Sequence, residues 1–261
     1  MSSVRILLIS DVEERSLWDF WNAKTAERLS GTGLILSAGD LKAEYLEFLV
    51  TMMNVPLVYV RGNHDEQYDR RPPEGCIDAD GRLVEVECRL CDDGSGTEVP
   101  GTAKVRVMGF GGSMRYRDGA RDMYTEREMA GRVRSAGLKM AAAGLAGSLR
   151  GRASAAGSGA DAAARPAFDI MLTHAPCKGY GDLDDLPHTG FECFNAFLNK
   201  FSPQLHCYGH VHKEYGGYFA VNAAGSPESA EEIKGFHRKL PHPSGTLLIN
   251  ASGHYLYDLE V

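Results

Sequence analysis

Residues 55–65 read Val55-Pro56-Leu57-Val58-Tyr59-Val60-Arg61-Gly62-Asn63-His64-Asp65. The first six are apolar almost throughout and predict a strand buried on both faces. Three polar residues then follow a glycine, and core packing gives no reason to choose them. In an α/β protein the carboxyl ends of neighbouring strands meet at one edge, where binding and catalytic residues gather. This stretch therefore predicts a buried strand with a functional site at its end.

Two similar apolar runs precede it, at residues 4–9 and 34–36, and helical patterns separate the three at 16–29 and 41–53. This order, with short connections, is typical of a parallel sheet with helical crossovers. Farther along, a helix is predicted over 189–200, and residues 82–89 and 104–108 alternate as half-exposed strands do. Further strands are predicted at 168–172, 205–208, 217–221, 246–249 and 255–259. We expect two packed sheets flanked by helices.

Residues 135–166 differ in composition from the rest of the chain, being almost entirely Ala, Gly, Ser and Arg. Alanine favours helix, so the first part could extend a helix that begins near residue 125. Residues 154–164 are predicted to be flexible. We expect a surface insertion within a single domain that spans residues 1–261.

The overall composition is 43% hydrophobic and 24% charged, which is typical of a soluble globular protein. The formal net charge of -7 argues against general affinity for nucleic acid. No apolar run approaches the ~18 residues of a membrane-spanning helix, and the first residues show no signal-peptide pattern. We therefore expect a cytoplasmic protein without a membrane partner, and the oligomeric state stays open.

Polar residues that commonly bind metals follow five of the predicted strands. They are Asp11, Asp40, Asn63 with His64, His174, and His210 with His212. Because the strand ends converge, these side chains can meet although they lie far apart in the sequence. Carboxylate oxygens combined with imidazole nitrogens suit Mn, Fe, Zn or Co better than a calcium site built of oxygens. A glycine precedes three of these positions, which allows tight turns beside the site.

Four blocks carry a resemblance to a known family: Gly39-Asp40, Gly62-Asn63-His64-Asp65, Thr173-His174 and Gly209-His210-Val211-His212. In order and spacing they resemble the calcineurin-like metallophosphoesterase superfamily, over nearly the whole chain. The resemblance implies a four-layered α/β/β/α sandwich of two mixed sheets flanked by helices. It also implies two divalent metal ions, with manganese preferred and iron, zinc, cobalt or magnesium as alternatives.

The resemblance further implies a role for each matched residue. The ligands would be Asp40 bridging both ions, Asp11 and His212 on the first ion, and Asn63, His174 and His210 on the second. His64 would act on the substrate, and Asp65 would steady His64. Hydrolysis of a small phosphodiester or phosphomonoester would follow from attack by a hydroxide that bridges the ions, whose pKa they lower toward ~7.

One position departs from the family pattern. The first block usually reads Asp-x-His, whereas here it reads Asp11-Val12-Glu13. Glu13 could reach an ion and, with its hard oxygen and negative charge, shift the preference toward Mn or Mg and away from Zn. Alternatively, the first site is weak or empty. The surrounding residues resemble a bacterial branch of the superfamily.

Substrate contacts are predicted from Arg115 and Tyr116, in the glycine-rich segment 111–117, and from the loop residue His188. Arginine suits bidentate contact with phosphate, and tyrosine could stack on a base. A solvated turn and a local hydrogen bond are the respective alternatives for Arg115 and His188.

Two other functions compete with hydrolysis of a small phosphoester. A nuclease could use the same scaffold, but the acidic net charge and the lack of a long basic run count against it. A non-catalytic metal-binding scaffold is favoured by Glu13, whereas the presence of His64 counts against it. The expected partner is a small phosphorylated substrate.

Overall fold

The computed structural model describes residues 2–92, 96–151, 167–215, 217–219 and 233–261. Its first three long apolar runs form β1 (Ser2–Ser10), β2 (Thr32–Ser37) and β3 (Leu57–Tyr59). These strands are parallel neighbours. The helices α1 (Ala23–Arg28) and α2 (Ala43–Met53) lie in the connections between them. The predicted parallel unit with helical crossovers is confirmed.

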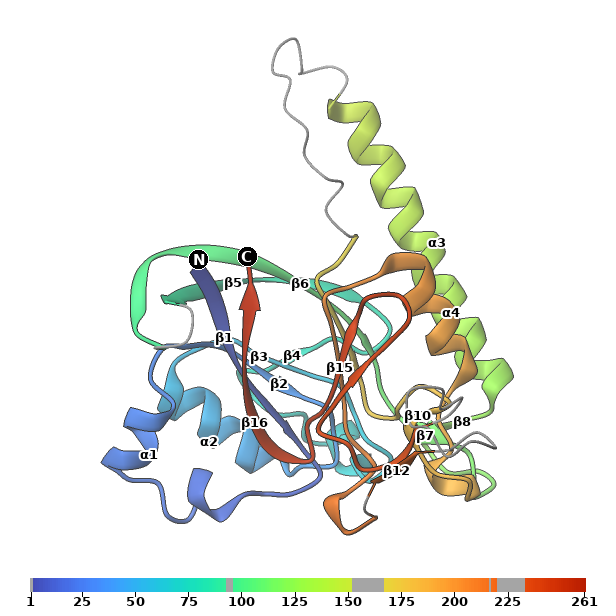
Figure 1. Ribbon diagram of the computed structural model, residues 1–261, viewed down its shortest axis with the longest axis horizontal. Helices are drawn as coiled ribbons and strands as arrows, with labels where there is room; N and C mark the ends of the chain where they lie inside the picture. The colour runs from blue at the N-terminus through green and yellow to red at the C-terminus, as the bar shows by residue number, and fades with distance from the viewer. Residues whose placement is uncertain (1, 93–95, 152–166, 216, 220–232) are drawn as a thin grey trace.

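The rest of the main sheet continues from β1 through a long antiparallel hairpin. This hairpin consists of β5 (Leu83–Asp92) and β6 (Glu98–Phe110). Beyond β6 come β9 (Ile170–Thr173), β11 (Leu205–Tyr208), β15 (Leu247–Asn250) and β14 (Lys239–Pro241). On the other side, β4 (Ile77–Asp78) pairs with β3, and β16 (Gly253–Glu260) pairs with β1, which sets the two chain ends side by side (Figure 1). Within the described residues, the sheet has 11 strands.

The packing of this sheet produces four layers. One buried cluster takes alternate residues of both halves, such as Val4 and Ile6 of β1 and Ile170 and Leu172 of β9, and it contains no residue of the described α-helices. The two halves therefore pack face to face. The opposite faces form two further clusters, one with α2 and one with α3 (Glu126–Gly151) and α4 (Glu192–Phe201). Figure 1 shows α1 and α2 on one side of the strands and α3 and α4 on the other.

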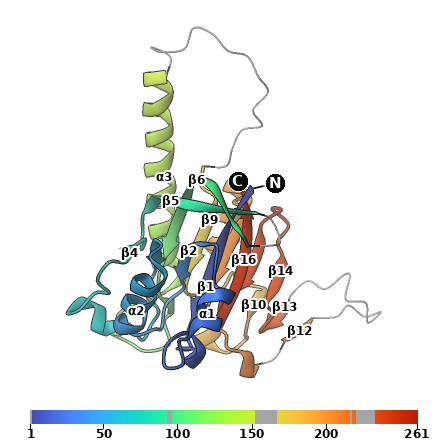
Figure 2. The ribbon, with the colours of Figure 1, turned by 90° about the vertical axis from the view of Figure 1, so that its left-hand side faces the viewer.

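The predicted sandwich is thus present, with one correction to its hydrogen bonding. Two separate sheets were expected, but β5 pairs with β1 through Ser2 and Ser3 and with β6 along almost its whole length. These pairings join both halves into one continuous sheet that folds over on itself. Figure 2 shows the hairpin crossing one end of the sandwich, with α3 rising beyond it.

Small local structures complete the chain. Short two- and three-stranded sheets are formed by β7 (Ser113–Met114) with β8 (Met123–Tyr124), and by β10 (Tyr180–Asp182), β13 (Ile233–Gly235) and β12 (Gly217–Phe219). Single turns of 3-10 helix are η1 (Arg15–Leu17), η2 (Glu66–Asp69), η3 (Leu186–His188) and η4 (Lys213–Tyr215). The last two turns border the candidate site.

One helical prediction needs correction, and another, that a helix beginning near residue 125 extends into the insertion, is confirmed. The single helix predicted over 16–29 is split into η1 and α1, because the side chain of Asn22 accepts hydrogen bonds from the backbone N–H groups of Lys24 and Thr25 and so begins a new helix. The insertion predicted over 135–166 is helical as far as Gly151 in α3. Residues 152–166, including the predicted flexible part, and the end of the strand predicted over 217–221 lie outside the described residues.

Helix α4 is held to α3 at its first turn. The carboxylate of Glu126 accepts hydrogen bonds from the backbone N–H groups of Glu192 (3.0 Å) and Cys193 (2.8 Å). These donors have no partner within their own helix, and an acidic group also interacts favourably with a helix N-terminus. Helix α4 begins at Glu192, three residues later than the predicted Thr189, and this contact caps its observed start.

A buried chain of hydrogen bonds supports the end of β9. The hydroxyl of Thr173 donates to the carbonyl of Ala175 (2.6 Å), so its oxygen must accept from Nε2 of His206 (2.8 Å). The other ring nitrogen of His206 then accepts from the thiol of Cys177 (3.5 Å). Burial lowers the pKa of His206 from 6.5 to about 3, so the imidazole stays neutral.

This buried imidazole predicts a loss of stability in acid. Below pH 6.5 the unfolded chain gains a proton at His206, whereas the folded chain gains it only near pH 3. The free energy of unfolding should therefore fall as the pH falls through this window, by up to about 1.4 kcal/mol per pH unit. Urea unfolding between pH 7 and pH 5 should show a shallower pH dependence for His206→Gln than for the parent.

Lys24→Gln is a suitable control, because Lys24 is exposed and a lysine stays charged throughout this range. Its free energy of unfolding should depend on pH as steeply as that of the parent. Equal slopes for the parent and His206→Gln would contradict the assignment of a neutral, buried His206.

Candidate functional site

The predicted ligands other than Glu13 meet at the carboxyl ends of β1, β2, β3, β9 and β11. A cavity of about 460 Å³ opens there, and five of them line it: Asp11, Asp40, Asn63, His210 and His212. His174 is fully buried and contacts both Asp40 and Asn63. The convergence that strand order predicted is therefore present in the structure.

The orientation of His174 is fixed from behind. Its Nδ1 lies 2.7 Å from the carbonyl oxygen of Ala38, and because a carbonyl can only accept, Nδ1 carries a hydrogen. Its Nε2 faces Oδ1 of Asn63 at 3.0 Å and Oδ2 of Asp40 at 3.4 Å. Burial alone would lower the pKa of His174, but the charge of Asp40 raises it to about 9. One nitrogen of His174 is thus aimed at two oxygen acceptors.

His210 is oriented in the same manner. Its Nε2 donates to the carbonyl oxygen of Pro187 (2.8 Å), which leaves the lone pair on Nδ1. Burial, aided by the nearby His174, lowers the pKa of His210 to about 3 and keeps it neutral. Potential ligand atoms of Asp40, His174 and His210 lie within 4.8 Å of one another. A backbone carbonyl that fixes the second nitrogen of a histidine is the usual arrangement around metal-binding histidines.

Asp40 contacts residues of two other loops of the site. Its Oδ1 accepts from the backbone N–H of His64 (2.8 Å), and its Oδ2 faces His174. Burial would raise the pKa of Asp40, but His174 and the His64 N–H hold it well below its usual range. Asp40 is therefore ionised and presents a partly buried negative charge to the cavity.

Three predicted ligands have an uncommon backbone conformation. Asp11, Asp40 and His210 have φ values of 63°, 56° and 68°, in the left-handed region that side chains with a Cβ seldom adopt. Such conformations carry a cost of about 1 kcal/mol or more and concentrate at functional sites. At His210 this turn brings the backbone N–H within 3.1 Å of both carboxylate oxygens of Asp11.

Glycines allow the ligand loops to approach closely. Gly39 has a φ of 96° and lies against the backbone of Gly62. A Cβ on Gly62 would overlap the carboxylate of Asp40, and one on Gly209 would overlap the hydroxyl of Ser10. The predicted need for glycine beside the ligands is therefore a direct steric requirement.

Asp65 has partners other than the one expected. Its Oδ2 accepts from the backbone N–H groups of Gly62 (2.7 Å) and Asp40 (2.9 Å), and within the described residues it forms no hydrogen bond with the His64 imidazole. Asp65 thus ties the loop after β3 to the loop after β2. Burial, with the charge of Asp40, raises the pKa of Asp65 to about 7. His64 itself is exposed and lines the cavity.

Glu13 is held away from the cavity. Its carboxylate accepts from the backbone N–H (3.1 Å) and Nζ (2.9 Å) of Lys42, and Glu13 is not among the cavity-lining residues. Of the residues expected around the first ion, His212 lies with Nε2 3.5 Å from Oδ1 of Asp11, and this contact raises the pKa of His212. The first-ion set is therefore smaller than the second.

The three residues predicted to bind substrate divide between two environments. Tyr116 and His188 line the cavity. Arg115 does not, because its guanidinium donates to the carbonyl of Met123 (3.2 Å) and pairs with Glu128 (2.9 Å). The prediction for Arg115 is not supported, since this pairing anchors the loop internally.

The sequence argument missed Tyr215. It lines the cavity, 44% exposed, and its ring centroid lies 4.6 Å from that of His188 and 6.0 Å from that of His212. The only signal was an aromatic residue three positions after the last histidine of a motif, which is too weak to have singled it out.

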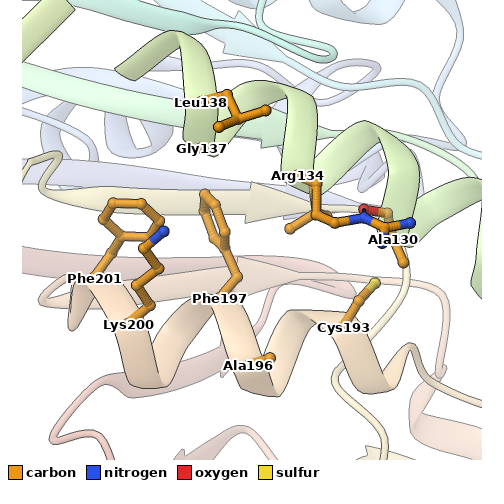
Figure 3. A pocket seen from close by; sticks show the side chains of 10 residues that line it. Ala130, Arg134, Gly137, Leu138, Cys193, Ala196, Phe197, Lys200 and Phe201 are labelled. Carbon is orange, nitrogen blue, oxygen red and sulfur yellow. Dashed lines mark hydrogen bonds between the residues drawn. The ribbon is translucent and has the colours of Figure 1, made fainter. Parts of the chain in front are cut away.

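A second cavity, of about 430 Å³, lies between α3 and α4, but it lacks the features of the first. Figure 3 shows Phe197 and Phe201 of α4 facing α3 and Leu138. Its lining is apolar apart from the rim residues Arg134 and Lys200, and no carboxylate or imidazole of the described residues lines it. The polar cavity at the strand ends is therefore the candidate site.

Comparisons with known proteins support the fold. No protein-family model matches the chain, and no curated protein matches it in sequence. The crystal structure of TT1561 of Thermus thermophilus is similar with a TM-score of 0.52 and 12% identity, over 98% of both chains. A second crystal structure has a TM-score of 0.55 and 13% identity, over 98% of this chain and 95% of that one. At these identities the likeness shows the fold alone.

None of the helices in the described residues combines the length and apolar character needed to span a bilayer.

The glycine contacts predict a site-specific loss of stability. Gly62→Ala should lower the free energy of unfolding by roughly 1–3 kcal/mol, because the new Cβ forces the Asp40 carboxylate to move. Gly131→Ala is the matched control, since Gly131 lies in α3 with open space around its Cβ position. Alanine there should be neutral or stabilising by up to about 1 kcal/mol. Urea denaturation measures both, and a Gly62→Ala protein as stable as the parent would contradict the steric argument.

Proposed function

We propose that this protein is a metal-dependent phosphoesterase that hydrolyses a small phosphodiester or phosphomonoester. The observation that carries the proposal is the convergence of Asp40, His174 and His210, with both imidazoles fixed by backbone carbonyls. The proposal agrees with the motif resemblance to the calcineurin-like metallophosphoesterase superfamily. It also agrees with an exposed His64 at the wall of the same cavity.

The donor set fits a divalent cation. Asp40 and Asn63 offer oxygens, and His174 and His210 offer nitrogens, a mixture that suits Mn, Fe, Zn or Co. In this arrangement, Oδ1 of Asn63 and Oδ2 of Asp40 face the same nitrogen of His174. Acceptors that converge in this way are stabilised when a cation lies between them. We therefore assign these four residues to one ion.

A second ion would share Asp40 and take Asp11 and His212. These residues supply fewer ligands, because Glu13 is bound to Lys42. We expect this position to bind its ion more weakly. Bound ions of this kind would neutralise charge on a phosphoryl group and lower the pKa of a coordinated water.

The protein's own groups would position the substrate and assist departure of the leaving group. The backbone N–H of His64 is bonded to Asp40, which sets the imidazole at the cavity wall beside the ligands. From there it could donate a hydrogen bond or proton to the leaving oxygen, a contribution of about a hundredfold or more. Asp65 contributes by holding the loop rather than by orienting the imidazole.

The competing functions are less well supported. A nuclease needs cations along its substrate groove, but in the described residues no lysine or arginine lines the cavity. A non-catalytic scaffold agrees with the reduced first-ion set. It leaves the exposed position of His64 without a reason.

His64→Ala tests the proposed function directly. The parent should hydrolyse p-nitrophenyl phosphate or bis(p-nitrophenyl) phosphate with added Mn and lose activity with a chelator. His64→Ala should lower kcat about a hundredfold or more while bound Mn, measured by atomic absorption, stays the same. His254→Ala is the control, because His254 pairs with Glu14 and does not line the cavity. No turnover by the parent with any ion, despite bound metal, would favour the scaffold.

Glu13→Ala tests the assignment of ligands. The variant should bind as much Mn as the parent after equilibrium dialysis, because Glu13 contacts Lys42 instead of the cavity. Asp40→Asn should lose bound Mn in the same experiment, since Asp40 is shared by both sets. A loss of one ion from Glu13→Ala would show that Glu13 is a ligand.

A further inference from the structure

The rim of the cavity differs in chemistry from the ligand set. Beside His64 and the five ligands, the cavity is lined by Tyr116, Pro187, His188 and Tyr215. Two of these are phenol rings, 37% and 44% exposed respectively for Tyr116 and Tyr215. Within the described part of the chain, this rim offers aromatic surface and no lysine or arginine side chain.

One wall of the rim is held in place by a chain of contacts. Nδ1 of His188 is bonded to the carboxylate of Asp185 (2.6 Å). The His188 ring lies 5.1 Å from the ring of His210 and 4.6 Å from the ring of Tyr215, measured between centroids. The carbonyl of Pro187 fixes His210 itself. Tyr215 therefore packs against His188, which itself contacts the predicted metal ligand His210.

The other aromatic residue is tied to the opposite ligand loop. The hydroxyl of Tyr116 accepts a hydrogen bond from Nδ2 of Asn63 (3.4 Å). Tyr116 and Tyr215 are thus each anchored beside a predicted ligand, and each retains a large exposed area. An exposed aromatic ring at a cavity of about 460 Å³ provides a stacking surface for a ligand larger than phosphate.

We propose that the substrate carries a planar aromatic ring, aryl or nucleobase, that stacks on Tyr215, together with a single phosphoryl group. The aromatic rim favours the ring, because stacking on an exposed aromatic side chain stabilises a bound base. The lack of lysine or arginine in the described rim disfavours additional phosphates, which proteins commonly bind with such residues. Naming the substrate a phosphoester rests on the proposed function.

The proposal is tested by binding, without turnover. The Mn-loaded full chain is titrated with phenylphosphonate, cyclohexylphosphonate and methylphosphonate by calorimetry. These probes share one phosphoryl head, and the first two differ in planarity at similar size. Phenylphosphonate should bind about tenfold more tightly than either of the others.

Variants locate the source of the preference. Tyr215→Leu should abolish the preference for the phenyl probe, whereas Tyr215→Phe should retain it. Leu186→Ala is the control, because Leu186 is exposed in η3 but does not line the cavity, and it should bind all probes as the parent does. Bound Mn should be equal in all four proteins.

The outcomes separate this proposal from the proposed function. Equal affinity for the three probes, no binding of any, or an unchanged preference in Tyr215→Leu would overturn the aromatic substrate class. Hydrolysis of simple phosphoesters would still support a phosphoesterase in each of these cases. Conversely, a phenyl preference that depends on Tyr215 in a protein without turnover would support the aromatic site and reject the phosphoesterase.

Discussion

The partly buried carboxylate of Asp40 is the constraint on which the site depends. One oxygen accepts the N–H of His64 and the other faces His174, while the N–H of Asp40 itself donates to Asp65. Loops after β2, β3 and β9 therefore meet at a single residue. If these loops moved apart, the charge of Asp40 would lose its partners, and this would cost a large amount of free energy. The loops can approach this closely because Asp40 has a positive φ and Gly62 has no Cβ.

The sequence predicted those parts of the fold that local pattern determines. The runs that form β1, β2, β3 and β11 are mostly apolar, which indicates strands covered on both faces, and the structure places them inside the four-layered sandwich. The union of the two halves through β5 and β6 was not predictable, because strand pairing between distant segments leaves no local pattern. The break within residues 16–29 depends on one capping side chain, Asn22, inside an otherwise continuous helical pattern.

The same division applies to the site. Strand order alone predicted that Asp11, Asp40, Asn63, His174 and His210 would meet, because their positions follow from topology. Side-chain partners were predicted poorly, because the spatial neighbours of a loop residue depend on the tertiary fold and are not visible in the sequence. Glu13 pairs with Lys42, Arg115 pairs with Glu128, and Asp65 accepts hydrogen bonds from two backbone N–H groups. In each case a charged side chain forms a hydrogen bond or ion pair with a group close to it in the fold.

This difference separates the predicted ligand set from the residues predicted to contact substrate. The ligands lie within a few residues of strand ends, and the glycines beside them are in steric contact with neighbouring ligand loops, so little can change there. Tyr116 and Tyr215 lie on surface turns and contact the predicted ligands through one hydrogen bond and one ring contact, respectively, whereas the turn of His188 also holds His210 through the carbonyl of Pro187. Substitutions of Tyr116 or Tyr215 can therefore alter the rim without moving the predicted ligands. The rim is therefore where this scaffold would set its choice of substrate, independently of how it holds a metal.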